Sequence, residues 1–451
     1  MDSLNVSHQS SLNFDTLAAV IPWITLRKDL LSFLTTCSGL YNSGILTLLG
    51  HPSNITNANL RQFHAFLTSR ASISFAALRD VKFCLSVKDT VPPPFDQDGM
   101  RILTNILSRA RNLRYLQVDG DILHKYPSIC ETLALLPSLV SLTVPTHPED
   151  TGRALLTSLQ SSLTKLVYNG ASGEVLDLQT SLAKSQHTLK EFILSDALIH
   201  HSGSAGGAVF SRLVRLELNG VTSLLLSVLI PAFPNLESLE LLYCHGETAD
   251  EDEENRGRNI QFQKNHPSLA WHLSSLTGDA TSLYSLSLKS KVPEVKVTTF
   301  LSEVEKVRLG VLLPPLRPQQ LILDDEAELT DEDEFFDTLS LIAISQPYLS
   351  AIHLTLYGGP ELSEMGYSYD TDSDESEDHD DLQRDIMLAT RAIQAIPSLK
   401  VIVFTIVSSN VWTSEWVCKT EGEMSVVEDE EYGTFLRAYK DWETLLREIL
   451  T

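Results

Sequence analysis

The chain has 451 residues, of which 43% are apolar, so it can bury a large hydrophobic core. Nearly half of the acidic residues behind its net charge of −25 stand in short runs without Lys or Arg, at residues 247–254, 324–334, 370–381 and 421–431. Outside these runs acids and bases nearly balance, and no cluster of Lys and Arg stands out, which argues against a nucleic-acid partner.

The chain starts with MDSLNVSHQSSLNFD, which lacks the basic start and apolar stretch of a secretory signal. No later apolar run approaches the roughly 20 residues that a membrane-spanning helix needs. We therefore expect an intracellular protein of the cytoplasm or nucleus, without a membrane partner.

Residues 11–50 predict a small helical segment with regularly spaced apolar positions, namely Leu12, Leu17, Val20, Ile21, Ile24, Leu30, Leu31 and Leu34. This spacing resembles an F-box, a three-helix motif that docks on the Skp-type adaptor of a cullin-RING ubiquitin ligase. The resemblance implies that these eight side chains bind that adaptor. The segment departs from the family pattern at Asn13, Pro22 and Tyr41. On the residues alone, a helical hairpin that caps the first repeat is the alternative.

Residues 51–72 are expected to form a linker or helix, and residues 73–410 a repeat array. The repeat is apolar-x-x-apolar-x-apolar, and six copies start 23 to 26 residues apart, at Leu113, Leu139, Leu163, Leu189, Leu213 and Leu236. Further copies are expected at Leu78/Val81/Phe83, Leu283/Leu286/Leu288, Leu321/Leu323, Leu349/Ile352/Leu354 and Leu399/Ile402/Phe404. The even step indicates one strand per repeat, packed on its neighbours.

The segments between the strands predict amphipathic helices, as at residues 150–163 and 382–396. A proline two residues before a strand, as in Leu136-Pro137-Ser138-Leu139, ends the helix there. The result is an α/β fold of alternating parallel strands and helices.

One repeat matches the strand signature LxxLxLxx(N/C) best, through Leu236, Leu239, Leu241 and Cys244. It resembles the leucine-rich repeat, and the resemblance over roughly residues 75–410 implies a solenoid whose Asn or Cys hydrogen-bonds the turn backbone. An ordinary α/β domain with crossover helices shares the same alternation and is the alternative.

The acidic runs 247–254, 324–334 and 370–381 are predicted to be solvated loop insertions. Run 370–381 has the oxygen spacing of a calcium loop, but Glu375 stands where such a loop needs glycine, so we expect no metal there. Residues 428–451 predict a helix that closes the end of the array, with an apolar stripe of Phe435, Tyr439, Trp442, Leu446 and Ile449.

Motifs of hydrolases, zinc proteases, phosphate-binding loops and dinucleotide-binding folds are absent from the sequence. His200 and His201 have no further ligand at metal-binding spacing. We expect no catalysis, no cofactor and no metal.

Side chains alternate along a strand, so if Leu116 faces the core then Tyr115 and Gln117 face the opposite side. The same parity predicts a continuous concave partner-binding face of Tyr115, Gln117, Ser141, Thr143, Lys165, Val167, Glu191, Ile193, Arg215, Glu217, Ser238 and Glu240. Its mixed charge suits a protein ligand better than a polyanion.

An F-box ahead of leucine-rich repeats resembles a class of eukaryotic proteins, including many in mushroom-forming fungi. That resemblance implies an adaptor that holds a ubiquitin-ligase core with one part and an unknown substrate protein with the other. A repeat scaffold without a ligase link is the alternative.

Overall fold

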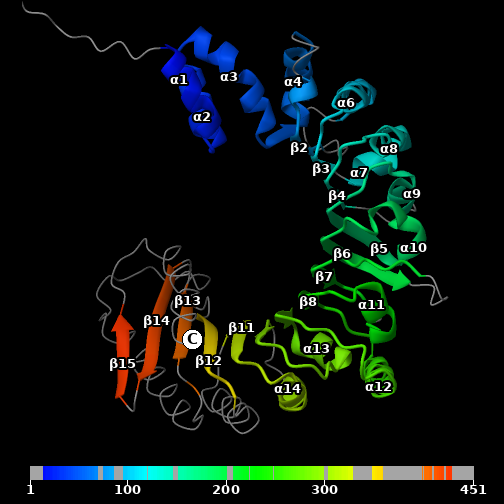
Figure 1. The fold of residues 1–451 in the computed structure, drawn as a ribbon, viewed down its shortest axis with the longest axis vertical. Helices are drawn as coiled ribbons and strands as arrows, with labels where there is room; N and C mark the ends of the chain where they lie inside the picture. The colour runs from blue at the N-terminus through cyan, green and yellow to red at the C-terminus, as the bar shows by residue number, and fades with distance from the viewer. Residues whose placement is uncertain are drawn as a thin grey trace, which may run out of the picture. The chain divides into compact units, whose positions relative to one another are not determined.

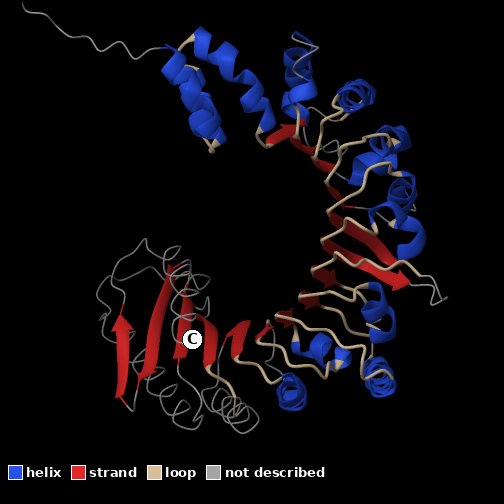
Figure 2. Ribbon diagram, in the orientation of Figure 1, coloured by secondary structure: helices blue, strands red, loops and turns tan. Residues whose placement is uncertain are grey.

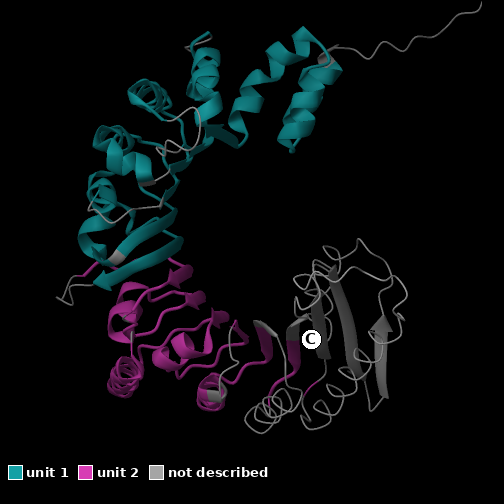
Figure 3. Ribbon diagram, turned by 180° about the vertical axis from the view of Figure 1, so that it is seen from behind, with its two compact units in different colours: residues 1–202 teal, residues 203–451 magenta. Residues whose placement is uncertain are grey.

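A computed structural model describes residues 14–69, 75–85, 95–118, 120–145, 151–200, 207–222, 224–246, 248–298, 303–328, 348–358, 399, 401–408, 411–420 and 423–428. The chain divides into two compact units, unit 1 (residues 1–202) and unit 2 (residues 203–451), which Figure 3 colours separately. In both units parallel strands alternate with helices along the chain (Figure 1). This α/β arrangement is consistent with a leucine-rich-repeat-like solenoid.

Unit 1 begins with a helical segment, as predicted, formed by α1 (Phe14–Val20), the 3-10 helix η1 (Ile21–Trp23), α2 (Arg27–Leu34) and α3 (Ser38–Gly50). Pro22 lies in the first turn of η1, where the backbone N–H that proline lacks would have no helical partner. The segment has its own core of Ile21, Leu30, Leu34, Leu40, Ile45 and Leu48.

Six parallel strands follow in the described part of unit 1, each paired with the next one in the sequence: β1 (Ser53–Thr56), β2 (Asp80–Cys84), β3 (Tyr115–Val118), β4 (Ser141–Pro145), β5 (Lys165–Asp177) and β6 (Glu191–His200). The connections carry α4 (Asn57–Ser69), α6 (Gln97–Arg109), α7 (Gly120–Lys125), α8 (Pro127–Ala134), α9 (Thr151–Ser158), α10 (Leu178–Ser181) and η2 (Ala183–Ser185). Residues 51–72, predicted as linker or helix, thus contain a strand as well as a helix. The strand was missed because only Ile55 provides an apolar core contact within it.

Unit 2 contains seven parallel strands in its described residues: β7 (Arg215–Asn219), β8 (Ser238–Leu242), β9 (Ser275–Gly278), β10 (Glu294–Val297), β11 (Gln320–Glu328), β12 (Ala351–Gly358) and β13 (Val401–Ser408). Two antiparallel strands extend this sheet, β14 (Val411–Thr420) and β15 (Glu423–Glu428). Its helices are α11 (Leu226–Ala232), α12 (Ala249–Asn265), α13 (Ala280–Leu286) and α14 (Glu303–Leu316).

The register of the six regular repeats is confirmed by the pairing of their central apolar residues. In unit 1, Leu116, Leu142, Leu166 and Phe192 are paired across β3 to β6, and all four are buried. In unit 2, Leu216, Leu239 and Leu276 are paired across β7 to β9, and they are buried as well. Successive repeats therefore align these buried apolar residues in one row in each unit.

Truncating Leu216 or Leu239 to alanine is expected to cost about 2 to 5 kcal/mol in the free energy of unfolding, because each leaves a cavity in this row. The matched control is Glu240→Ala, one residue further on and facing away from the helices, which we expect to change stability by less than about 0.5 kcal/mol. Urea denaturation of the full chain, followed by circular dichroism, measures the difference. Equal stability of all three variants would show that the register is wrong.

The repeat predicted at Leu283/Leu286/Leu288 is wrong, since Leu283 and Leu286 lie in α13. Asp279 begins that helix, because its side chain accepts a hydrogen bond of 2.8 Å from the Ser282 backbone N–H. The strand of this repeat is β9, which lies before the helix. Its third core position is a glycine, Gly278, so the apolar pattern is incomplete.

The acidic run 247–254, predicted as a loop, is helical from residue 249 onward, where it forms the first turns of α12. Carboxylates in a first helical turn are stabilised by the helix dipole, and Thr248 accepts a capping bond from the Glu251 N–H. Residues 324–328 of the second run belong to β11. The structure does not describe run 370–381, the helix predicted at residues 382–396 or residues 429–451.

Within the described parts, no helix has the length and apolar character needed to cross a membrane.

The chain turns in the same way at strands β6, β7 and β8. In each of them, the residue two places after the last buried apolar residue of the repeat has left-handed backbone angles. These residues are Asp196 (φ 57°), Gly220 (φ 66°) and Tyr243 (φ 55°). The residue after each is buried, and in β8 it is the signature cysteine, Cys244. Burial raises the pKa of its thiol to about 12, and Sγ donates to the Leu218 carbonyl at 3.1 Å. Cys244 therefore hydrogen-bonds the end of strand β7 in the preceding repeat.

Candidate functional site

The predicted partner-binding residues of unit 1 lie on β3 to β6, on the sheet face turned away from the connecting helices (Figure 2). They form two paired rows, the first of Tyr115, Ser141, Lys165 and Glu191, and the second of Gln117, Thr143, Val167 and Ile193. Tyr115 is 47% exposed, and the other seven are half-buried. Parity along the strands thus brings all eight residues to one face.

Charges on this face of unit 1 are paired across neighbouring strands. Lys165 Nζ lies 2.7 Å from Glu191 Oε2, and both side chains are partly exposed. A pair of this kind contributes only about 0.2 to 1 kcal/mol to stability, so a partner can replace it at small cost. Two charged residues of β2, Asp80 and Lys82, were not predicted as part of this face. Strand pairing places them beside Tyr115 and Gln117 in the same rows.

The unit 2 residues of the predicted face lie on β7 and β8 and are likewise paired, Arg215 with Ser238 and Glu217 with Glu240. Arg215 Nη2 lies 3.4 Å from Glu240 Oε2 and 3.5 Å from Glu217 Oε2. Ser275 Oγ on β9 donates to Ser238 Oγ at 2.9 Å. The described face of unit 1 therefore carries balanced charge, whereas two carboxylates, Glu217 and Glu240, face one cation, Arg215, on β7 and β8. The role of these faces in binding stays a prediction.

The face of unit 2 continues onto β10, which the repeat pattern missed, and onto β11 and β12, which it predicted at Leu321/Leu323 and Leu349/Ile352/Leu354. Lys296 Nζ on β10 lies 2.6 Å from Asp324 Oδ2 on β11. Burial lowers the pKa of His353 on β12 to about 4, against the opposing effect of Asp324, so its imidazole is neutral near pH 7. The charges of Lys296 and Asp324 cancel, so these residues add no net positive charge to the face.

The predicted adaptor-binding residues fall into three groups. Ile21, Leu30 and Leu34 are buried in the core of the N-terminal helices, and Leu17 and Ile24 pack against that core. Val20 and Leu31 are exposed, whereas Leu12 lies outside the described residues.

Three further apolar side chains of this segment are exposed and were not predicted: Trp23, at 82%, Leu26, at 65%, and Leu46 of α3, at 41%. We call the four on the stretch from α1 to α2 the exposed apolar set: Val20, Trp23, Leu26 and Leu31. Pro22, which directly precedes Trp23, is the sequence signal that could have predicted this exposure, because the chain turns into the short helix η1 there.

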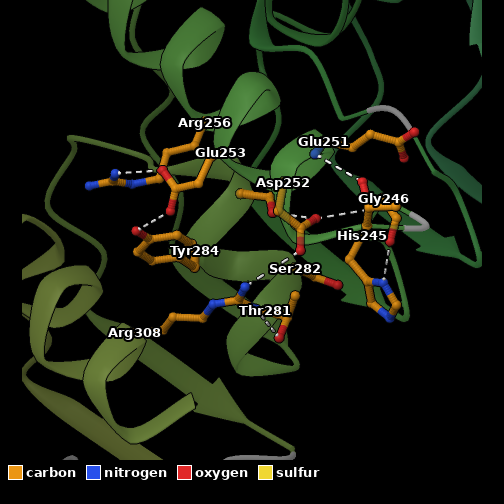
Figure 4. Close-up of polar contacts among 12 residues, drawn as sticks. His245, Gly246, Glu251, Asp252, Glu253, Arg256, Thr281, Ser282, Tyr284 and Arg308 are labelled. Atoms are coloured by element: carbon orange, nitrogen blue, oxygen red, sulfur yellow. Dashed lines mark hydrogen bonds and ion pairs between the residues drawn. The ribbon is translucent and has the colours of Figure 1, made fainter. Parts of the chain in front are cut away.

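A buried polar cluster of unit 2 joins α12, α13 and α14 (Figure 4). Asp252, 3% exposed, accepts hydrogen bonds from the Gly246 N–H at 2.8 Å and from Ser285 Oγ at 3.1 Å. Its other oxygen lies 3.6 Å from Arg308 Nη2. The cluster thereby fixes the start of the acidic helix α12 against the two following helices.

A second part of this cluster surrounds Tyr284. Its hydroxyl donates to Glu253 Oε1 at 2.7 Å, and this contact lowers the pKa of Glu253. The guanidinium carbons of Arg256 and Arg308 lie 4.4 and 5.2 Å from the centre of the Tyr284 ring. These contacts join α12, α13 and α14.

Chemistry-bearing groups are sparse in the described parts of the chain. No group of three or more His, Cys, Asp or Glu side chains there has the geometry to hold a metal ion. A cavity of about 740 Å³ beside α3 is lined by Leu46, Thr47, Gly50, His51, Ala76, Ala77 and Arg79. This lining contains no paired nucleophile and base.

Comparison of the sequence with protein-family models gives no match, and no curated protein matches it.

Proposed function

We propose that the chain is a non-catalytic adaptor that binds a substrate protein through the sheet face and a Skp-type adaptor of a cullin-RING ubiquitin ligase through its N-terminal helices. The observation that carries the proposal is the pair of rows on β3 to β6, in which polar, charged and apolar side chains stand in register on the face opposite the helices. Mixed surfaces of this kind are typical of protein interfaces.

The ligase part of the proposal is supported by the exposed apolar set on the N-terminal helices. Trp23 and Leu26 project from a segment that already has a complete core of its own. Trp is the residue type most enriched among side chains that dominate binding energy. A partner that covers these side chains would remove a large apolar area from water.

A repeat scaffold without a ligase link is the second candidate, and one observation favours it. Ile21, Leu30 and Leu34 of the predicted adaptor-binding set are buried inside the helical segment. A segment that uses its apolar residues internally can serve as a cap for the first repeat.

Binding of a purified Skp-type adaptor to the full chain separates the two candidates. The double variant Trp23→Asp, Leu31→Asp is expected to lower adaptor affinity by about tenfold or more, because it places charge in the contact. The control is Leu135→Asp, which changes an exposed leucine of unit 1 outside the N-terminal helices. Thermal unfolding should be the same for all three proteins. Failure of the wild-type chain to retain the adaptor at micromolar concentration would rule out the ligase link.

The same proteins test the sheet face. Changing Tyr115, Lys165, Arg215 and Glu240 together to alanine is expected to abolish recovery of co-purifying substrate proteins, identified by mass spectrometry, and to leave adaptor binding intact. Unaltered substrate recovery would move the binding site away from this face.

A further inference from the structure

The cavity of about 740 Å³ in unit 1 lies between the end of α3 and the turn that precedes β2. In its described lining, residues between 46 and 51 form one side, and residues between 76 and 79 form the other. Its volume falls within the range of about 300 to 1,000 Å³ that is usual for small-molecule sites. Whether the cavity is a site depends on how its two sides are held and on which groups they present.

The α3 side of the cavity is fixed by Arg27 of α2. Its Nη1 lies within hydrogen-bond distance of four acceptors: the carbonyl oxygens of Leu48 at 3.2 Å, His51 at 3.3 Å and Pro52 at 3.1 Å, and Ser53 Oγ at 2.8 Å. A cation at this end of a helix satisfies carbonyl groups that have no helical partner and is stabilised by the helix dipole. This side is therefore held by contacts inside the N-terminal segment.

The side before β2 is held by the next repeat. Asn112 Nδ2 donates to the Ala76 carbonyl at 2.8 Å. The Arg79 carbonyl accepts from the backbone N–H groups of Arg114 at 2.8 Å and of Tyr115 at 2.9 Å. Each side of the cavity is thus anchored by bonds that do not cross it, so the space between them is preformed.

The cavity surface is mostly apolar, and much of it lacks long side chains. Gly50, Ala76 and Ala77 contribute nothing beyond Cβ, and a Cβ atom added to Gly50 would meet no atom within 4 Å. Leu46, which is 41% exposed, provides the largest apolar side chain of the described lining. A ligand with an apolar body would remove this surface from water.

The charge at the cavity is positive, although the net charge of the chain is −25. Residues 30–79, which include the whole described lining, contain no Asp or Glu. Among the described residues, the Arg79 guanidinium has no hydrogen bond or ion pair. Asp80 follows Arg79 but belongs to the sheet-face row beside Tyr115, and burial raises its pKa without an opposing effect of Arg79. An unpaired cation in surroundings without acids favours an anionic ligand.

We propose that this cavity binds a small organic carboxylate with an apolar body. The carboxylate accepts two parallel hydrogen bonds from the Arg79 guanidinium, whose planar fork of N–H groups matches its geometry. The His51 imidazole supplies a further N–H donor, and the apolar body lies against Leu46 and Ala77. This site is separate from the sheet face and from the exposed apolar set, so it goes beyond the proposed function and does not depend on it.

Isothermal titration calorimetry of the full chain with octanoate and octanamide tests the charge preference, because the two probes differ in charge and hardly in shape. Octanoate is expected to bind about tenfold or more tightly than octanamide. Arg79→Gln should weaken octanoate binding to the level of octanamide and leave octanamide binding unchanged. The matched control is Arg111→Gln, which changes an exposed arginine of unit 1 outside the lining and should bind both probes as wild type does.

Gly50→Leu localises the probes to the cavity. The leucine side chain extends into the open space beside Gly50 and is expected to abolish the binding of both probes. Gly50 ends α3 and is not in the left-handed region. Leucine is a good helix former, so the unfolding temperature of this variant should not fall below that of wild type.

The proposal would be overturned by the absence of octanoate binding, by equal affinity for the two probes, by wild-type octanoate affinity in Arg79→Gln, or by wild-type binding in a folded Gly50→Leu chain. Arg79→Gln should still bind the Skp-type adaptor and recover substrate proteins. Failure of the carboxylate site would therefore leave the proposed function standing, and failure of adaptor binding would leave the carboxylate site standing.

Discussion

Replacing Asp252 by alanine is expected to destabilise unit 2 by about 3 to 5 kcal/mol, because it breaks a buried ion pair from one side. Arg308, whose side chain is only 13% exposed, would keep its charge without the carboxylate 3.6 Å away. The Gly246 N–H would also lose its buried acceptor. The start of α12 and its contacts with α13 and α14 should loosen together.

Urea denaturation of Asp252→Ala measures this cost, with Asp250→Ala as the control on the exposed side of the same helical turn. Asp252→Asn separates charge from hydrogen bonding, since an amide oxygen can still accept from Gly246 and Ser285. We expect it to fall between the other two. A stability of Asp252→Ala within about 0.5 kcal/mol of the Asp250 control would contradict a structural role for the cluster.

Trp271→Ala is expected to cost about 3 to 5 kcal/mol in the free energy of unfolding, since it empties the volume of a fully buried indole. The ring Nε1–H donates to the Phe233 carbonyl at 2.8 Å, so the substitution also leaves that oxygen unpaired. Trp271 thus ties the segment before β9 to the end of α11.

The companion variant Trp271→Phe keeps most of the apolar volume and removes only the donor. It should lower the free energy of unfolding by less than the alanine variant does. The difference between the two costs measures the contribution of the cavity apart from the hydrogen bond. Circular dichroism during thermal and urea unfolding of the full chain provides both values. Equal costs for the two substitutions would mean that packing contributes nothing measurable at this position.

The regular strands could be predicted because each repeat places its own leucine against the leucine of the next. Leu216 and Leu239 are paired for this reason, and their spacing in the sequence is the spacing of the repeat. Val292, Val295 and Val297, at and just before β10, fit the same apolar spacing, but this repeat was missed because the leucines of α13 before it were assigned to a repeat instead. Helix α12 was missed because acidic composition indicates solvation, whereas Asp252 is fixed by residues far away in the sequence.

The candidate site was predictable only in part. Alternation along strands and the repeat register place Lys165 beside Glu191, but the sequence does not show that the two side chains reach each other to form the ion pair. On short helices, the spacing of apolar residues does not tell which of them are buried and which are exposed. Leu30 and Leu31 are adjacent in the sequence, yet the first is fully buried and the second exposed.

The order of the strands has a consequence for how the protein is made. In each unit every parallel strand pairs with the one synthesised just before it, so contacts join residues about one repeat apart. A nascent repeat can therefore pack as soon as it leaves the ribosome, without waiting for distant parts of the chain. Each new strand covers the edge of its predecessor, which shortens the time for which an unpaired edge is open to aggregation.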